Sequence, residues 1–291
     1  MYMGKSTCDK FDLAEGRLKS FTRSAVRTKL MLCLIDGSKE AGVLEEAIGL
    51  RSTTILHSAK EMIDAGLIQK VDKGYALTNI GRIESTVLNT LVDCILALDR
   101  HHEFWMTHDL SGIPLDLQTK IGMLAESEVV ASDQNAPLRS HEFFLSELSR
   151  SKEIYAASPV AFPGFSKAIA DAVRRGARVD LILTEGILNA VEREQNDLLG
   201  DLRHRENFRL YTAGYELKAA FTITDSALSL GLFRQNGAYD LGNDLICTGE
   251  TARAWGKELF DHYLARSMYS KGSSLPLVKE RSPHQMSSTL I

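Results

Sequence analysis

The sequence predicts an α/β protein overall, in which a mostly helical N-terminal unit with a β-hairpin is joined by a long linking helix to a C-terminal α/β domain with a mixed sheet. Helical periodicities followed by a tight hairpin occupy residues 24–78, and an apolar helical pattern continues over 79–99. Short strands then alternate with helices from residue 126 onward. We therefore expect domains at 15–80, 81–125 and 126–268, followed by a mobile, serine-rich tail at 269–291.

Three short helices are expected in the N-terminal unit. Apolar residues at three-and-four spacing predict the first helix over 26–35, and a similar pattern predicts a second over 43–48. Gly49 then allows a turn into the third helix, which we expect Ser52 or Thr53 to cap. The apolar positions of this third helix should face the other two helices: Ile55, Ala59, Met62 and Ile63.

A hairpin is expected to follow the third helix. Residues 67–71 and 75–78 alternate in polarity about the turn sequence Asp72-Lys73-Gly74, which places Lys70 and Lys73 near its tip. Three helices followed by a two-stranded wing are the elements of a winged helix-turn-helix, whose third helix reads the major groove of DNA.

The outward face of the third helix predicts contact with double-stranded DNA. Short hydroxyls, an imidazole and one lysine suit close approach to phosphates and base edges. The candidate DNA-binding residues are Ser52, Thr53, Thr54, Leu56, His57 and Lys60 of the helix, with Lys70 and Lys73 of the wing. A similar unit can also bind proteins, so a non-DNA-binding adaptor that uses the winged helix for a protein partner is the alternative.

The distribution of charge predicts a homodimer. Residues 1–80 contain 12 Lys and Arg against 10 Asp and Glu, whereas the rest of the chain contains 22 against 28, which together give the net charge of −4. A unit with a charge of only +2 neutralises few phosphates, so one copy should bind DNA weakly. We therefore expect two copies to bind an inverted repeat together.

The expected helix over 79–99 offers an interface for this dimer. One apolar stripe contains Ile80, Ile83, Val87, Leu91, Ile95 and Leu98, and a neighbouring one contains Leu88, Val92 and Leu96. This face is wider than one partner requires. It can pack between the domains of its own chain, form the dimer interface, or do both.

Composition excludes several classes of protein. With 44% hydrophobic and 25% charged residues, no apolar run approaches the roughly 18 residues of a membrane span, and the first residues lack the apolar core of a signal peptide. A cytoplasmic protein is therefore expected. The four cysteines, Cys8, Cys33, Cys94 and Cys247, are far apart and fit isolated thiols rather than disulfides or a zinc site.

A cluster of histidines and acids at residues 101–109 invites comparison with a metal site. No further ligand follows before the turn at 111–114, so a packing role is the stronger interpretation. We expect neither a metal nor a cofactor.

The C-terminal domain should contain a parallel βαβ unit. Strands over 153–157 and 179–183 flank a helix over 165–175 that ends before Gly176. The remaining expected elements are a strand at 128–131, a helix at 187–202, a strand at 208–211, a hairpin of 219–224 with 227–233, a strand at 244–247 and a helix at 250–265.

A small-molecule effector site is expected at the carboxyl ends of the parallel strands, where ligands of α/β sheets bind. The candidate residues are Ser158, Thr184 and Glu185 after the strands, Lys218, Thr222, Thr224 and Asp225 on the hairpin, and Phe162 and Trp255 as closing side chains. Taken singly, each has a simpler interpretation as a turn or core residue.

The motifs of this domain resemble a known family. The quoted segments are SGIP at 111–114, ASPVAFPGF at 157–165, VDLILTEGIL at 179–188, KAAFTITDSALSLGLFRQNGAYDL at 218–241 and AWGKELFDHY at 254–263. They resemble the archaeal methanogenesis-regulatory transcription factors, in which an ArsR-like winged helix is joined to a regulatory domain. The resemblance spans about 24–267 and implies a DNA-binding transcriptional regulator of a methanogenic archaeon whose C-terminal domain is a sensor.

The same domain is distantly similar to phospholipase D-like domains, which raises an enzymatic hypothesis. Phospholipase D chemistry uses a nucleophilic histidine followed two residues later by lysine, and none of the 8 histidines has lysine at that spacing. The sequence also lacks GxSxG, GxxxxGK[ST] and HExxH motifs. We therefore expect no catalytic activity.

Overall fold

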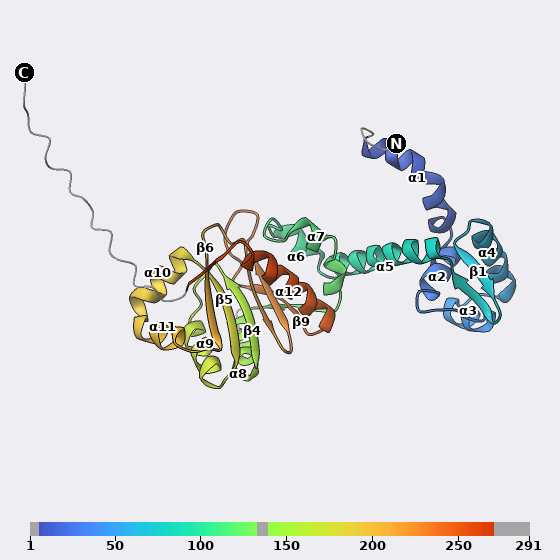
Figure 1. Ribbon diagram of the computed structural model, residues 1–291. Helices are drawn as coiled ribbons and strands as arrows, with labels where there is room; N and C mark the ends of the chain where they lie inside the picture. Colours follow the sequence, from blue (N-terminus) through green and yellow to red (C-terminus); the bar gives the residue numbers. More distant parts are fainter. Residues whose placement is uncertain (1–5, 133–138, 271–291) are drawn as a thin grey trace, which may run out of the picture. The chain divides into compact units, whose positions relative to one another are not determined.

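The computed structural model describes residues 6–132 and 139–270, which form two compact units (Figure 1). The first unit ends at His102 and also includes Thr119–Ala125. The second contains Glu103–Gln118 and the residues from Glu126 onward. The mixed α/β class is confirmed, and each unit has its own hydrophobic core.

The first unit has the predicted order of three helices, hairpin and long helix. Its elements are α1 (Thr7–Thr22), α2 (Ala25–Cys33), α3 (Ala41–Ile48), α4 (Ser52–Asp64), β1 (Ile68–Val71), β2 (Gly74–Leu77), α5 (Asn79–Arg100) and the short 3-10 helix η1 (Ile121–Leu124). The sequence analysis missed α1. Its start carries a capping box in which Ser6 accepts from the Asp9 amide and Asp9 accepts from the Ser6 amide.

The core of the first unit confirms most of the predicted helix faces. Leu30 of α2, Leu44 of α3 and Ile55 of α4 are fully buried together. Two details were wrong. Ile63 is exposed, because it lies one position beyond the face that Ile55, Ala59 and Met62 share. Neither Ser52 nor Thr53 caps α4, because the helix begins one residue earlier than expected and Arg51 occupies the N-cap.

The wing is an antiparallel pair anchored to the connection between α2 and α3. Val71 pairs with Gly74, which leaves Asp72 and Lys73 as the two turn residues. Tyr75 and Lys39 exchange backbone hydrogen bonds of 3.0 Å in both directions. Gly74 has a φ of 114°, and a Cβ there would lie 2.1 Å from the Lys39 carbonyl oxygen. Only glycine therefore allows this close approach.

The second unit contains an eight-stranded mixed sheet in the order β10-β6-β5-β4-β7-β8-β9-β3 (Figure 1). The strands β4, β5 and β6 are parallel, which confirms the predicted βαβ unit, and the remaining pairs are antiparallel. The strands are β3 (Ser127–Ala131), β4 (Glu153–Ser158), β5 (Arg178–Thr184), β6 (Phe208–Ala213), β7 (Ala219–Thr224), β8 (Leu228–Leu232), β9 (Asn243–Cys247) and β10 (Met268–Tyr269).

Helices cover both faces of this sheet. Those of the second unit are α6 (His102–Thr107), α7 (Leu115–Gln118), α8 (Arg139–Arg150), α9 (Phe165–Arg174), α10 (Glu185–Glu194), α11 (Asn196–Arg203) and α12 (Glu250–Leu264). α12 packs against β4, β7 and β8, whereas α9 and α10 pack against β5. The sequence analysis missed α6 and α8, whose amphipathic patterns are short or bounded by weak start signals.

Two predictions in this domain were wrong in detail. The helix expected over 187–202 is broken at Gln195, whose φ of −142° lies outside the helical region. The expected tail begins later than 269, because Tyr269 pairs with Tyr211 in the edge strand and the Ser270 amide donates to the Leu210 carbonyl. The remainder of the expected tail, 271–291, lies outside the described residues.

The thiol of Cys247 should resist alkylation in the folded protein. Burial raises the pKa of Cys247 to about 12 and so keeps the thiol in its neutral, unreactive form at pH 8. Cys8 is exposed. Peptide mapping after brief treatment with iodoacetamide at pH 8 should find Cys8 modified and Cys247 unmodified, whereas both should react in guanidinium chloride. Rapid labelling of Cys247 in the native protein would contradict the buried position of β9.

Candidate DNA interface and ligand pocket

Helix α4 presents a polar surface to solvent. Burial of Ile55, Ala59 and Met62 turns the intervening positions outward. Ser52 is half-buried at the edge of this surface, and its exposed members are Thr53, Thr54, Leu56, His57 and Lys60. The two wing lysines, Lys70 on β1 and Lys73 in the turn, are also exposed. The structure thus leaves the predicted DNA-binding side chains accessible on one folded unit.

An ion pair reduces the negative charge beside this surface. The Nε2 atom of His57 lies 3.8 Å from Oε1 of Glu61, which follows it by one helical turn. Arg27 of α2 pairs with the other carboxylate oxygen of Glu61 and also donates to the Ser20 carbonyl at 2.9 Å. Because Arg27 offsets the charge of Glu61, the positive charge of Lys60 is left largely uncompensated on the helix surface.

One face of α5 is apolar and exposed. Ile83, Val87 and Leu91 retain 68%, 65% and 55% of their exposure, and Ile80, Ile95, Leu96 and Leu98 are exposed with them. Leu88 points the other way and is buried in the core of the first unit. The predicted second stripe therefore packs partly within the chain, whereas the first remains accessible along the helix.

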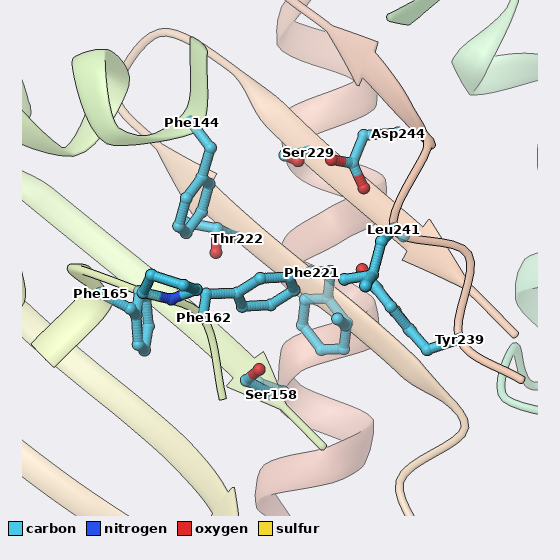
Figure 2. Close-up of a pocket in the computed structure, with 14 residues that line it drawn as sticks. Phe144, Ser158, Phe162, Phe165, Phe221, Thr222, Ser229, Tyr239, Leu241 and Asp244 are labelled. Atoms are coloured by element: carbon cyan, nitrogen blue, oxygen red, sulfur yellow. The ribbon is translucent and has the colours of Figure 1, made fainter. Parts of the chain in front are cut away.

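A pocket of about 380 Å³ lies in the second unit over the strands β4, β7 and β8 (Figure 2). Its volume lies within the roughly 300–1,000 Å³ of small-molecule sites. The lining consists of aromatic and aliphatic side chains with a few polar groups: Phe144, Ala157, Ser158, Phe162, Pro163, Phe165, Ala220, Phe221, Thr222, Ser229, Gly231, Tyr239, Leu241 and Asp244.

Small residues on the sheet create this space. Thr222 pairs with Ser229 and Ala220 pairs with Gly231, so four small residues of β7 and β8 share one face. Phe162, in the loop after β4, reaches across the pocket towards Tyr239 (Figure 2). Its ring centroid is 6.4 Å from that of Phe144 and 5.8 Å from that of Tyr239. Aromatic rings therefore enclose the pocket above the small residues of the sheet.

The far wall of the pocket is held by a buried hydrogen-bond network. Asp240, between the lining residues Tyr239 and Leu241, accepts hydrogen bonds from the Gly242 amide at 2.9 Å and from Asn243 at 2.9 Å. Its Oδ2 lies 3.1 Å from Nε2 of His108, and Arg234 donates to the same oxygen. Desolvation opposes ionisation, but these hydrogen bonds and the nearby charge lower the pKa of Asp240 and keep it a carboxylate.

His108 connects this wall to the segment that follows α6. Its Nδ1 lies 2.6 Å from the Phe104 carbonyl, and the neighbouring Asp109 amide donates to the Phe233 carbonyl at 2.7 Å. The histidine and acid cluster at 101–109 is thus used in packing, as expected. Within residues 6–132 and 139–270, no three His, Cys, Asp or Glu side chains are grouped to hold a metal ion.

Of the nine predicted ligand-binding residues, three line this pocket: Ser158, Phe162 and Thr222. Thr184 caps α10 by accepting from the Ile187 amide, and Glu185 begins that helix. Lys218 instead pairs with Asp109 at 3.3 Å. Sequence reasoning missed the opposite wall, Tyr239, Leu241 and Asp244, although its ASPVAFPGF and QNGAYDL segments contain the loops that form it.

The other three predicted residues have structural positions. Thr224 closes the turn between β7 and β8 by accepting from the Ala227 amide at 3.0 Å. Asp225 accepts from the Lys152 amide at 2.9 Å, which places both at the amino end of β4 rather than its carboxyl end. The reason is that β7 runs antiparallel to β4, so its last residues lie at the opposite edge. Trp255 is fully buried and donates to the Leu117 carbonyl at 3.0 Å.

None of the helices that the structure describes is both long and apolar enough to cross a membrane.

A winged-helix unit with an exposed polar recognition helix, joined to a mixed-sheet domain that contains a ligand-sized pocket, defines a two-part regulatory protein. The chain matches the family models for methanogenesis regulatory protein FilR1, with its N-terminal domain at residues 15–96 and its middle domain at 137–266. The chain belongs to this family of regulatory proteins.

Similar proteins agree with this assignment. The chain is 40% identical over 269 residues to the methanogenesis regulatory protein FilR1 of Methanothrix harundinacea (strain 6Ac), covering 89% of this chain. It spans 59% of the length of that relative. Distant structural likenesses include TrmBL2, an archaeal chromatin protein, at 14% identity and a TM-score of 0.40, covering 90% of this chain and 99% of that one. NucT from Helicobacter pylori has 16% identity and a TM-score of 0.37, covering 49% and 98%.

Proposed function

We propose that this protein is a cytoplasmic transcriptional regulator that binds an inverted-repeat DNA site as a homodimer and whose second unit senses a small molecule. The observation that carries the proposal is the polar, accessible surface of α4 beside the wing lysines, on a unit whose remaining helices are packed together. Thr53, His57 and Lys60 are the side chains that we assign to the major groove and its phosphates.

The apolar face of α5 supports dimerisation. Its stripe of exposed residues continues along a helix of 22 residues, which corresponds to about 33 Å. Extended exposed apolar surfaces are typical of protein interfaces. Because a two-fold axis brings the same surface of two copies together, this uncharged stripe is complementary to itself. Two weakly basic winged helices would then bind DNA together.

The pocket and its wall support sensing. Tyr239 and Leu241 line the pocket, and Asp240 between them is hydrogen-bonded to His108. His108 follows α6, which in turn follows α5 in the chain. A molecule that moves this wall would therefore act on the segment next to the proposed dimer helix, which is the kind of coupling that regulation requires.

Replacing Lys60 with alanine should weaken binding to duplex DNA several-fold and reduce the dependence of log Kd on log salt by about one. Lys60 is exposed on the outward surface of α4, so its loss removes a phosphate contact without opening the core. Fluorescence anisotropy with DNA from upstream of its own gene, at several salt concentrations, measures both quantities. A further His57→Ala replacement should abolish specific retention in a gel-shift assay.

Lys167→Ala provides the matched control, because Lys167 is an exposed lysine on α9 of the other unit. It should leave both the affinity and the salt dependence unchanged. If the wild-type chain shows no salt-sensitive retention of this DNA, the regulator proposal fails and the adaptor alternative is favoured.

A further inference from the structure

We propose that the pocket over β4, β7 and β8 binds an aromatic molecule that carries an amine or a hydroxyl group, and that it excludes carboxylates. The inference deepens the proposed function, because it rests on that function only in taking the bound molecule to be the effector. The molecule would lie between the phenylalanine side chains of the outer wall and the small residues of the sheet, with its polar group towards Asp244 (Figure 2).

The walls favour a flat, aromatic body. Phe144, Phe162 and Phe165 form one side of the pocket, with Phe144 and Phe165 stacked at a centroid distance of 5.7 Å. Tyr239 lies across from them and meets Phe162 edge-on, at an interplanar angle of 70°. Aromatic pairs gain from such stacked and edge-to-face contacts beyond the area that they bury. An aromatic ring can therefore use the same contacts on both sides.

The polar groups of the pocket favour a donor on the ligand. Asp244 supplies a carboxylate, and Ser158, Thr222 and Ser229 supply hydroxyls that accept or donate. Among the 14 described residues that line the pocket there is no Lys, Arg or His. A carboxylate placed here would be removed from water without a cation and beside an acid of like charge, which is costly. An amine or hydroxyl would instead hydrogen-bond to Asp244.

The end of the pocket beside Asp244 has a defined shape. The ring of Tyr239 is half-buried, but its hydroxyl lies against the buried backbone of Gly231, where a Cβ would be only 1.9 Å away. The same Cβ would lie 2.7 Å from Oδ1 of Asp244, so Gly231 makes room for both polar groups. Burial, together with the charges of Asp244 and Asp240, raises the pKa of Tyr239 well above its usual value. Its hydroxyl is therefore neutral.

Three naphthalene derivatives with the same ring test this selectivity: 2-(1-naphthyl)ethylamine, 2-(1-naphthyl)ethanol and 1-naphthylacetate. Isothermal titration calorimetry of the full chain without DNA, at constant ionic strength, gives the three dissociation constants. We expect the amine to bind at least about tenfold more tightly than the carboxylate, with the alcohol between them. Equal affinities, a preference for the carboxylate, or no binding of the amine and alcohol would overturn the proposal.

Two variants test the location of binding. Ser229→Leu should fill the pocket and abolish binding of the amine, and its thermal unfolding shows whether the fold is retained. Asp244→Asn keeps the size of the side chain and removes its charge, so the preference for amine over carboxylate should fall to about threefold or less. Asp197→Asn removes an exposed acid on α11 and should retain the wild-type preference. If Asp244→Asn also retains it, the assigned position of the amine is wrong.

The outcomes separate this inference from the proposed function. If the amine binds as expected but leaves the affinity for DNA unchanged, the pocket assignment stands and the sensing part of the regulator proposal fails. If DNA binding is salt-sensitive and depends on Lys60 but no probe binds, the pocket assignment fails and DNA recognition stands.

Discussion

Replacing Val87 with glutamate (Val87→Glu) should make the protein monomeric and lower its affinity for an inverted-repeat site by at least about 100-fold, equivalent to roughly 2.7 kcal/mol. Val87 retains 65% of its exposure in the middle of the α5 stripe. At a two-fold interface, one substitution introduces two carboxylates, each removed from water without a cation. Sedimentation velocity measures the oligomeric state, and fluorescence anisotropy measures DNA affinity.

Asn89→Glu is the matched control for this experiment. Asn89 is exposed two positions along the same helix, which places it on nearly the opposite side from Val87. The substitution adds the same charge and should leave both the dimer and DNA binding intact. A wild-type chain that sediments as a monomer, or a Val87→Glu variant that remains dimeric, would show that α5 is not the dimer interface.

Trp255→Ala should lower the free energy of unfolding of the second unit by about 3–5 kcal/mol. Trp255 is fully buried between α12 and the sheet, and its indole N–H donates to the Leu117 carbonyl of α7. Truncation opens a large cavity and leaves that carbonyl without its partner. Denaturant unfolding followed by circular dichroism measures the loss, with the two units treated as separate transitions where they do not coincide.

Trp255→Phe separates the two contributions to this loss. Phenylalanine keeps much of the ring volume but removes the N–H donor, so the destabilisation should be clearly smaller than that of alanine. If Trp255→Ala changes the free energy of unfolding by less than about 1 kcal/mol, the packing of α12 is not as described. Either variant that folds should still bind the naphthyl amine, because Trp255 does not line the pocket.

Residues close together in the chain could be placed from the sequence with useful accuracy. The order of helices and hairpin over 24–78 was predicted because each element depends on local periodicity and on turn residues such as Gly49. The parallel pairing of β4 with β5 was also predicted, since a strand, helix and strand in succession leave little choice of connection. The family motifs around residues 157–165 and 218–241 led to the correct family.

The candidate pocket shows where this reasoning stops. Ser158, Phe162 and Thr222 were placed correctly because they lie at or near the carboxyl end of β4 or on the strand beside it. Thr224 and Asp225 were misplaced, because the direction of β7 relative to β4 reverses which end of the strand meets the site. Asp244 and Tyr239 were missed because they come from a loop and strand whose pairing with β8 is not local.

By itself, the sequence determined the winged-helix order, the βαβ unit, the apolar stripe of α5 and the membership of the family, because these depend on spacing and composition along the chain. Only the tertiary structure decided which stripe of α5 is exposed, that Trp255 belongs to the core and that Tyr239 and Asp244 share a pocket with Phe162. The physical reason is that burial and convergence depend on contacts between distant segments, whose pairing no local pattern specifies.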